Sequence, residues 1–180
     1  MSQNNEINYD NATHNGDNNF VPLTSLEQAI SEIIKKLGRN SDAVDIIDDL
    51  ADFITDHPSR EIIGLEGKLV NGNRQDLCGR AVLLKNKFER KVAKQQMSII
   101  EQHVYVQILS KISTVWHEII KPQIDAGVSR ETIDSLIHSQ INEPVHKAIV
   151  KYDVGATSES VAGMLYYLTG KCHIVWAPEC

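Results

Sequence analysis

The chain has 180 residues, of which 42% are hydrophobic, and its formal net charge is −6 at pH 7. This composition excludes a wholly disordered chain and is sufficient for one folded domain with a hydrophobic core. No apolar run reaches the roughly 18 residues needed to cross a bilayer, and no basic-then-apolar leader opens the sequence, so we expect no membrane span and no signal peptide.

The three cysteines are Cys78, Cys172 and Cys180. They are odd in number, widely spaced and not paired in a CxxC motif, which argues against a disulfide framework or a cysteine-based zinc module. We therefore expect a reducing, cytoplasmic setting.

The N-terminal residues 1–22 are rich in asparagine and poor in apolar side chains. Such a segment buries too little surface to offset the entropy lost on ordering, which predicts a disordered, flexible arm. The alternative is an arm that orders on a partner or in a homo-oligomer, because Asn-rich segments can pair as strands.

A helical hairpin is predicted at residues 23–57. Thr24 and Glu27 have the spacing of a capping box, and apolar residues at helical intervals follow up to Leu37. A second apolar stripe predicts a helix from Ser41 to His57. Aspartates at helical spacing line this helix and predict a solvated or partner-facing acidic surface rather than a metal site: Asp42, Asp45, Asp48, Asp49, Asp52 and Asp56.

Residues 58–79 contain several Gly and Asn residues and predict a turn-rich linker. Residues 80–121 then lack Gly and Pro and have apolar residues at three- and four-residue intervals, which predicts two long helices or one bent helix. In a compact fold, we expect the break at residues 95–98.

Three shorter helices are predicted in the last part of the chain. They cover residues 129–140, residues 144–150 with a proline at the start, and residues 158–169, ending at Gly170 in the left-handed conformation. The residues after Gly170 predict a short extended tail. The fold class is therefore all-α, a multi-helix bundle with long central helices between a disordered arm and an extended tail.

We find no pattern of catalytic or metal-ligating residues. The seven histidines form no HExxH motif, and the serines form no GxSxG elbow. Cys172 and His173 are adjacent in a segment expected to be extended, where neighbouring side chains point apart, so the pair is unsuited to nucleophilic catalysis. We predict no enzymatic activity, no metal and no cofactor.

A local group of basic residues is the clearest charge feature. If residues 80–94 are helical, these residues form one strip on the helix. The strip is predicted to be a solvated face or a partner of the aspartate-rich helix of the same chain; the alternative is contact with phosphate or with an acidic partner. The candidate residues are Arg80, Lys87, Arg90, Lys91 and Lys94. The net acidity of the chain and the scarcity of interleaved aromatic residues argue against nucleic acid as the first choice.

The C-terminal aromatic residues are candidates for partner contacts, since aromatic side chains serve both cores and interfaces. Trp176 is the first candidate because it lies beyond the last predicted helix. The full set of predicted partner-binding residues is Tyr166, Tyr167, His173 and Trp176.

The segment from Asp76 to Trp176 resembles the C-terminal module of prokaryotic ABC-three-component defence systems. The resemblance is carried by KNKFERKVAKQQMSIIEQHVYVQILSKI (85–112), Pro122, AGVSRETIDSLI (126–137), Glu143-Pro144 and GMLYYLTGKCHIVW (163–176). It implies a helical module, here residues 80–180, that links an effector to an SMC-like ATPase. The matching motifs are structural, so no catalytic residue is implied.

Before this module, the sequence offers only the arm and the hairpin, so we expect an accessory or adaptor subunit rather than a complete effector. The predicted function is that of a non-enzymatic interaction subunit of a bacterial anti-phage or anti-plasmid complex, with an SMC-like ATPase and an effector as partners. The alternatives are a nucleic-acid-binding protein that uses residues 74–94, with nucleic acid also reachable through the complex, and a small stand-alone effector.

Overall fold

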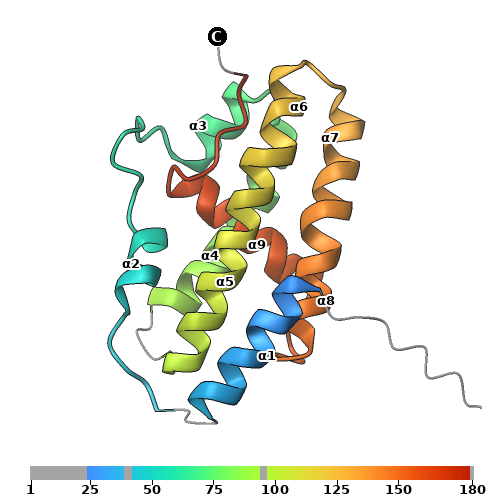
Figure 1. The fold of residues 1–180 in the computed structure, drawn as a ribbon. Helices are drawn as coiled ribbons and strands as arrows, with labels where there is room; N and C mark the ends of the chain where they lie inside the picture. Colours follow the sequence, from blue (N-terminus) through green and yellow to red (C-terminus); the bar gives the residue numbers. More distant parts are fainter. Residues whose placement is uncertain (1–23, 39–41, 94–96, 179–180) are drawn as a thin grey trace, which may run out of the picture.

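The computed structural model describes residues 24–38, 42–93 and 97–178 (Figure 1). These residues form the predicted all-α fold, and within them the only strand-like feature is an isolated antiparallel bridge between Ala43 and Ser98. None of the helices in these ranges is long and apolar enough to span a membrane. The predicted disorder of residues 1–22 concerns a segment outside the described residues, and the predicted division into domains stays a prediction.

The first helix, α1 (Ser25–Leu37), begins at the predicted capping box. The hydroxyl oxygen of Thr24 accepts a hydrogen bond from the backbone N–H of Glu27 at 3.3 Å, and the Glu27 carboxylate accepts one from the Thr24 backbone N–H at 2.6 Å. The two bonds satisfy N–H groups that have no partner within the helix, so the local sequence is sufficient to position this helix start.

The second helix is shorter than predicted, because α2 covers only Asp48–Ile54. The residues before it are held in an extended conformation by the buried side chain of Gln102, whose amide nitrogen donates to the carbonyl oxygens of Val44 and Asp45. Its amide oxygen accepts from the backbone N–H of Ile47 at 2.8 Å. This tertiary contact overrides the helical pattern of the sequence. Both α1 and α2 pack on α5 (Figure 1).

Helix α3 (Gly64–Asn71) lies in the segment expected to be rich in turns. Leu65 and Leu69, one helical turn apart, are buried, and α3 packs against α4 and α9. A single 3₁₀ turn (Gln75–Leu77) then leads directly into α4 (Cys78–Ala93).

The break expected at residues 95–98 is confirmed, because α4 ends at Ala93 and α5 (Ile99–Val115) has its own N-terminal cap. The Ser98 hydroxyl accepts from the Glu101 N–H at 3.2 Å, and the Glu101 carboxylate accepts from the Ser98 N–H at 2.9 Å. The long region without Gly or Pro therefore contains two helices rather than one bent helix.

Two prolines, Pro122 and Pro144, lie inside longer helical stretches, although Pro144 was expected to begin a separate helix. A π-helical turn, Trp116–Ile120, joins α5 to α6 (Lys121–Asp125), and a second one, His138–Asn142, joins α7 (Arg130–Ile137) to α8 (Glu143–Val150). Each turn is followed by a proline near the start of the next helix, Pro122 or Pro144. Proline lacks the N–H that a helix interior requires, and a wider turn before it avoids its clash with the preceding carbonyl. The separate helices predicted at residues 129–140 and 144–150 are thus one continuous stretch.

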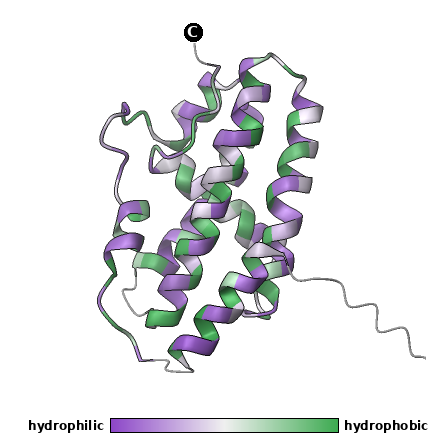
Figure 2. Ribbon diagram, viewed as in Figure 1, coloured by the Kyte–Doolittle hydropathy of each residue, from purple (hydrophilic) through white to green (hydrophobic). Residues whose placement is uncertain are grey.

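The last helix, α9 (Ser158–Gly170), is the centre of the core. Most residues from Val161 to Thr169 are buried, so α9 is covered on nearly all sides, whereas the outer helices expose their hydrophilic faces (Figure 2). Its closest neighbour is α4: a Cβ at Gly163 would lie 2.7 Å from the carbonyl oxygen of Leu84. The absence of a side chain at Gly163 therefore allows the two backbones to approach.

Candidate partner-binding site

The C-terminal tail, residues 171–178, leaves α9 through a turn at Cys172, whose φ is +65°. The left-handed conformation predicted at Gly170 is wrong, since Gly170 is the last residue of α9 and has no positive φ. Its lack of a side chain leaves room for Lys85, whose Cε would lie 2.9 Å from a Cβ at this position. The predicted extended conformation is wrong at Cys172, which lies in a turn, and residues 174–176 follow without helix or strand.

The first residues of the tail are held by the segment between α2 and α3. Nη1 of Arg60 donates to the carbonyl oxygens of Cys172 at 2.8 Å and His173 at 2.9 Å, and the backbone N–H of His57 donates to the Lys171 carbonyl at 3.0 Å. A charged donor shared by two carbonyls makes a stronger contact than a neutral hydrogen bond. The tail is therefore part of the folded domain.

Trp176 is 3% exposed and lies in an aromatic cluster. Its ring centroid is 4.6 Å from that of Trp116 and 6.5 Å from that of Tyr166, and the Arg74 guanidinium lies 5.3 Å from the ring centroid. The indole N–H donates to the hydroxyl oxygen of Thr169 at 3.1 Å. Tyr166 and Thr169 belong to α9, Trp116 to the π-helical turn between α5 and α6, and Arg74 to the turn after α3. The end of the tail is therefore packed against all three.

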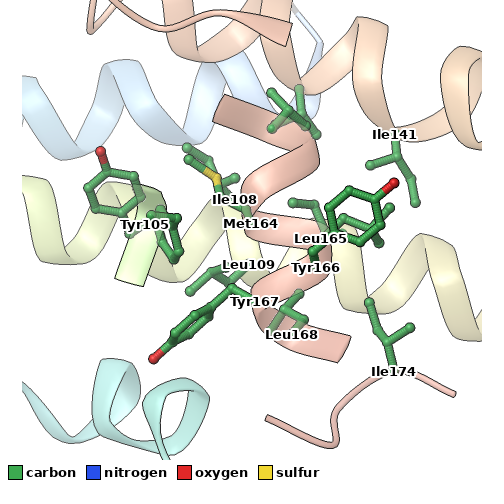
Figure 3. Close-up of a cluster of buried hydrophobic side chains, with 14 of the residues drawn as sticks. Tyr105, Ile108, Leu109, Ile141, Met164, Leu165, Tyr166, Tyr167, Leu168 and Ile174 are labelled. Atoms are coloured by element: carbon green, nitrogen blue, oxygen red, sulfur yellow. The ribbon is translucent and has the colours of Figure 1, made fainter. Parts of the chain in front are cut away.

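Tyr166 and Tyr167 lie on α9 and point to different sides of it (Figure 3). Both rings are buried, and the Tyr167 ring packs edge-on against Phe88 of α4 at 5.1 Å between centroids. Burial raises the pKa of each phenol above its ordinary value, so both stay uncharged at neutral pH.

His173 is the most accessible of the four aromatic candidates, and it is half-buried. Its Nε2 is hydrogen-bonded to the Thr55 carbonyl at 3.2 Å, and its ring contacts the rings of Phe53 and His57. Burial and the nearby charges of His57 and Arg60 lower the pKa of His173. All four candidate side chains thus contact other segments of the same chain. Their contact with another protein stays a prediction.

The predicted basic strip lies along α4, but most of its charges have partners in the same chain. Arg80 and Lys87 both reach Glu159 at the start of α9, at 3.7 and 3.4 Å, and Lys91 reaches Asp153 at 3.2 Å. The predicted pairing with the aspartate-rich helix is replaced by these contacts, while Lys94 lies outside the described residues.

The outer face of α4 also carries an apolar residue that sequence reasoning did not single out. Leu83 is 56% exposed, and it lies one helical turn from both Arg80 and Lys87. Arg90, on the same exposed side, has no ion pair among the residues that the structure describes. We call Arg80, Leu83, Lys87 and Arg90 the α4 outer face.

The aspartates around α2 form the predicted acidic surface. All six are exposed: Asp42, Asp45, Asp48, Asp49, Asp52 and Asp56. Asp56 also lies 3.9 Å from the Lys171 ammonium. Within the described ranges, no group of three or more His, Cys, Asp or Glu residues has an arrangement that could hold a metal ion. Their use as a partner-facing surface stays a prediction.

Arg74 is a buried charge that sequence reasoning did not select as a site. Its guanidinium pairs with Asp134 of α7 and packs on Trp176, beside a cavity of about 350 Å³ that Arg130 and Ile133 also line. Arg130 in turn pairs with Asp76 at 2.7 Å. The two ion pairs fix the turn after α3 to α7. No periodic signal in the sequence identifies such a long-range pair.

A protein-family model matches residues 64–176, and it describes C-terminal domain 9 (CTD9) of the ABC-three component (ABC-3C) systems. The match begins at the first residue of α3 and ends at Trp176. It therefore includes α9, the tail up to Trp176 and the α4 outer face, but not His57 and Arg60, which bind the start of the tail. Neither a search of curated proteins nor a search of solved structures gave a significant match.

Proposed function

This chain belongs to the family of C-terminal domain 9 of the ABC-three component systems, and on that basis we propose that it is a non-enzymatic interaction subunit of a bacterial defence complex. Its role is to connect an SMC-like ATPase with an effector in a response against phage or plasmid DNA. The observation that carries this proposal is the family match to a complete set of packed helices and their bound tail, residues 64–176.

The α4 outer face is the surface that we propose for this docking. Interfaces commonly combine an apolar centre with a polar rim, and Arg is enriched among their energetically important residues. Leu83 supplies an exposed apolar side chain, Arg90 adds a charge without an ion pair among the described residues, and Arg80 and Lys87 share the single Glu159 carboxylate and so keep a net positive charge. A partner that complements this face has an apolar pocket for Leu83 and acidic side chains around the pocket.

A protein partner suits this face better than nucleic acid does. The phosphate backbone attracts unpaired Lys and Arg, and its binding strength grows with the number of charges that it neutralises. Glu159 and Asp153 already neutralise much of the charge on Arg80, Lys87 and Lys91. Leu83 and Arg90 are exposed and are not involved in these ion pairs. An exposed leucine beside an arginine suits a protein partner that makes apolar contacts better than it suits a phosphate backbone.

The test is co-purification of the tagged chain with the ATPase and effector of its own system. Leu83→Asp and Arg90→Glu change exposed side chains, and we expect each to reduce recovery of the partner at least tenfold. Lys36→Glu is the matched control for Arg90→Glu, because it makes the same charge change at an exposed position on α1. Full recovery with both α4 variants would contradict docking through this face.

The same purified variants distinguish the nucleic-acid alternative. Binding through Arg and Lys weakens steeply as salt concentration rises, with a slope set by the number of phosphates contacted. We expect the wild-type chain to show no such salt-dependent binding to DNA or RNA. Binding that is lost in Arg90→Glu but retained in Leu83→Asp would replace the proposed protein interface by a nucleic-acid interface.

A further inference from the structure

The cavity of about 350 Å³ beside Arg74 lies at the end of the molecule where the tail meets α3, α6 and α7, at the top of Figure 1. Its volume is within the range of pockets that bind small molecules. Such pockets combine a mostly apolar wall with a few polar groups that orient the ligand. The wall here has this composition, with two arginines, Arg74 and Arg130, and four apolar side chains, Ile124, Val128, Ile133 and Trp176.

The wall of the cavity is positively charged, although both arginines are in ion pairs. Arg74 pairs with Asp134, and Arg130 pairs with Asp76. Neither carboxylate lines the cavity, and both are about half-exposed, where water screens their charge. No acidic side chain is among the described residues that line the cavity. The charges nearest to a group in the cavity are therefore those of the two guanidinium groups.

Arg74 has hydrogen-bond donors that its ion pair does not use. A guanidinium carries five N–H donors, and Nη2 of Arg74 donates to the Asp134 carboxylate. Nε of Arg74 is buried and has no hydrogen-bond partner among the described residues. A buried donor without an acceptor costs free energy, whereas an anionic oxygen makes a strong, charge-assisted bond to a guanidinium. The chemistry of Arg74 thus favours a ligand with anionic oxygens.

The charged and apolar parts of the wall are held in place by the fold. The Arg74 guanidinium lies 5.3 Å from the ring centroid of Trp176, and the Trp176 indole N–H donates to Thr169 at 3.1 Å. The ion pair between Arg130 and Asp76, at 2.7 Å, positions the second guanidinium. Binding to side chains that are already positioned loses less conformational entropy than binding to mobile ones.

We propose that this cavity binds a small organic anion, with a carboxylate or phosphate group and a compact apolar body. The anionic oxygens accept hydrogen bonds from Arg74 and Arg130, while the body packs on Trp176 and on the aliphatic side chains of the wall. The inference does not rest on the docking role proposed above, because no described residue that lines the cavity belongs to α4.

Titration of the folded chain with benzoate, phenyl phosphate and benzamide tests the inference. The two anions share a phenyl ring and differ in the anionic group, and benzamide is the uncharged counterpart of benzoate. The measurement is the shift of the Trp176 indole N–H signal by nuclear magnetic resonance, and Trp176→Phe identifies that signal by its loss.

We expect at least one of the two anions to bind with a Kd of about 1 mM or tighter. Benzamide should bind at least about tenfold more weakly than that anion. Acetate and inorganic phosphate lack the ring, and the one that corresponds to the bound anion should also bind at least about tenfold more weakly. The anion that binds more tightly identifies the anionic group of the ligand.

Two variants test the two parts of the wall. Arg130→Gln removes a charge from an exposed side chain, and Val128→Phe fills part of the cavity from a half-buried position. We expect each to weaken binding at least about tenfold. Arg90→Gln and Val154→Phe are the matched controls, because they make the same changes at exposed positions outside the cavity, and both should bind as the wild-type chain does. Circular dichroism confirms that each variant is folded.

Three results would overturn the inference. The first is a Trp176 signal that neither anion shifts at millimolar concentration. The second is binding of benzamide or of the anion without a ring as tightly as the phenyl anion, which would exclude the combination of charge and apolar contact. The third is unchanged binding in both Arg130→Gln and Val128→Phe, which would place the probe outside the cavity.

Discussion

Replacement of Trp176 by alanine tests whether the tail is a structural part of the domain. The side chain is 3% exposed, contacts Trp116, Tyr166 and Arg74, and donates one hydrogen bond to Thr169. Truncation of a buried tryptophan to alanine lowers the free energy of unfolding by about 3–5 kcal/mol. Because a domain of this size has a total stability of about 5–15 kcal/mol, this loss is a large fraction of the whole.

Urea denaturation followed by far-ultraviolet circular dichroism measures this loss without depending on tryptophan fluorescence. We expect Trp176→Ala to lower the transition midpoint strongly. Trp176→Phe keeps the ring contacts but loses the hydrogen bond to Thr169, so we expect a smaller loss, of about 1–3 kcal/mol. Val154→Ala is the control: Val154 is 90% exposed, and we expect a change within about 0.5 kcal/mol.

A loss below about 1 kcal/mol in Trp176→Ala would refute this reasoning, because surface positions give losses of that size. It would mean that the tail is detached in solution and that the ring is available to another protein. In that case Trp176 would return to its first interpretation, as a residue whose main contact is with a partner.

Three further changes test other parts of the fold. Gly163→Ala places a Cβ against the Leu84 carbonyl, and we expect an overpacking cost of about 1–3 kcal/mol that exceeds the helix-propensity gain of about 1 kcal/mol, measured by urea denaturation. His173 has a pKa lowered from 6.5 by burial and by charges that include Arg60, so the unfolded chain binds more protons below that pH. Stability is thus complete above about pH 6.5 and falls as the pH drops toward the folded pKa; a urea midpoint with the same pH dependence in His173→Gln would contradict this. Gln102→Leu leaves the backbone groups before α2 without partners, and we expect a loss of about 2–4 kcal/mol together with faster amide hydrogen exchange in residues 43–47.

The helices could be predicted wherever the determining signal was local. The capping box at Thr24 and Glu27 gave the start of α1, and apolar periodicity gave most of α4, α5 and α9. Ser98 and Glu101 have the same capping-box spacing at the start of α5, so the break before that helix can be predicted from the local sequence. Prediction failed for the residues from Val44 to Ile47, because their backbone groups are bonded to the Gln102 side chain, more than fifty residues away.

The tail shows why the candidate site was harder to predict than the fold. Arg74 and Trp116, which contact Trp176, come from two distant segments, and no periodic pattern links them to the tail. Sequence reasoning selected the aromatic residues of the tail as partner contacts, and that role stays a prediction. Their burial within the chain was settled by long-range packing, which also buries Tyr166 and Tyr167.

The proposed docking face and the packing of α9 lie on opposite sides of α4, and this arrangement determines which variants can identify an interface. The inner side of α4 contacts α9 through Leu84 and Phe88, and α9 leads directly into the bound tail. A change at Trp176 therefore alters the support of the α4 outer face even if no partner touches the tail. Loss of partner binding in Trp176→Ala would not distinguish these two causes. Leu83→Asp does, because Leu83 is largely exposed and its replacement leaves the α4–α9 contact intact.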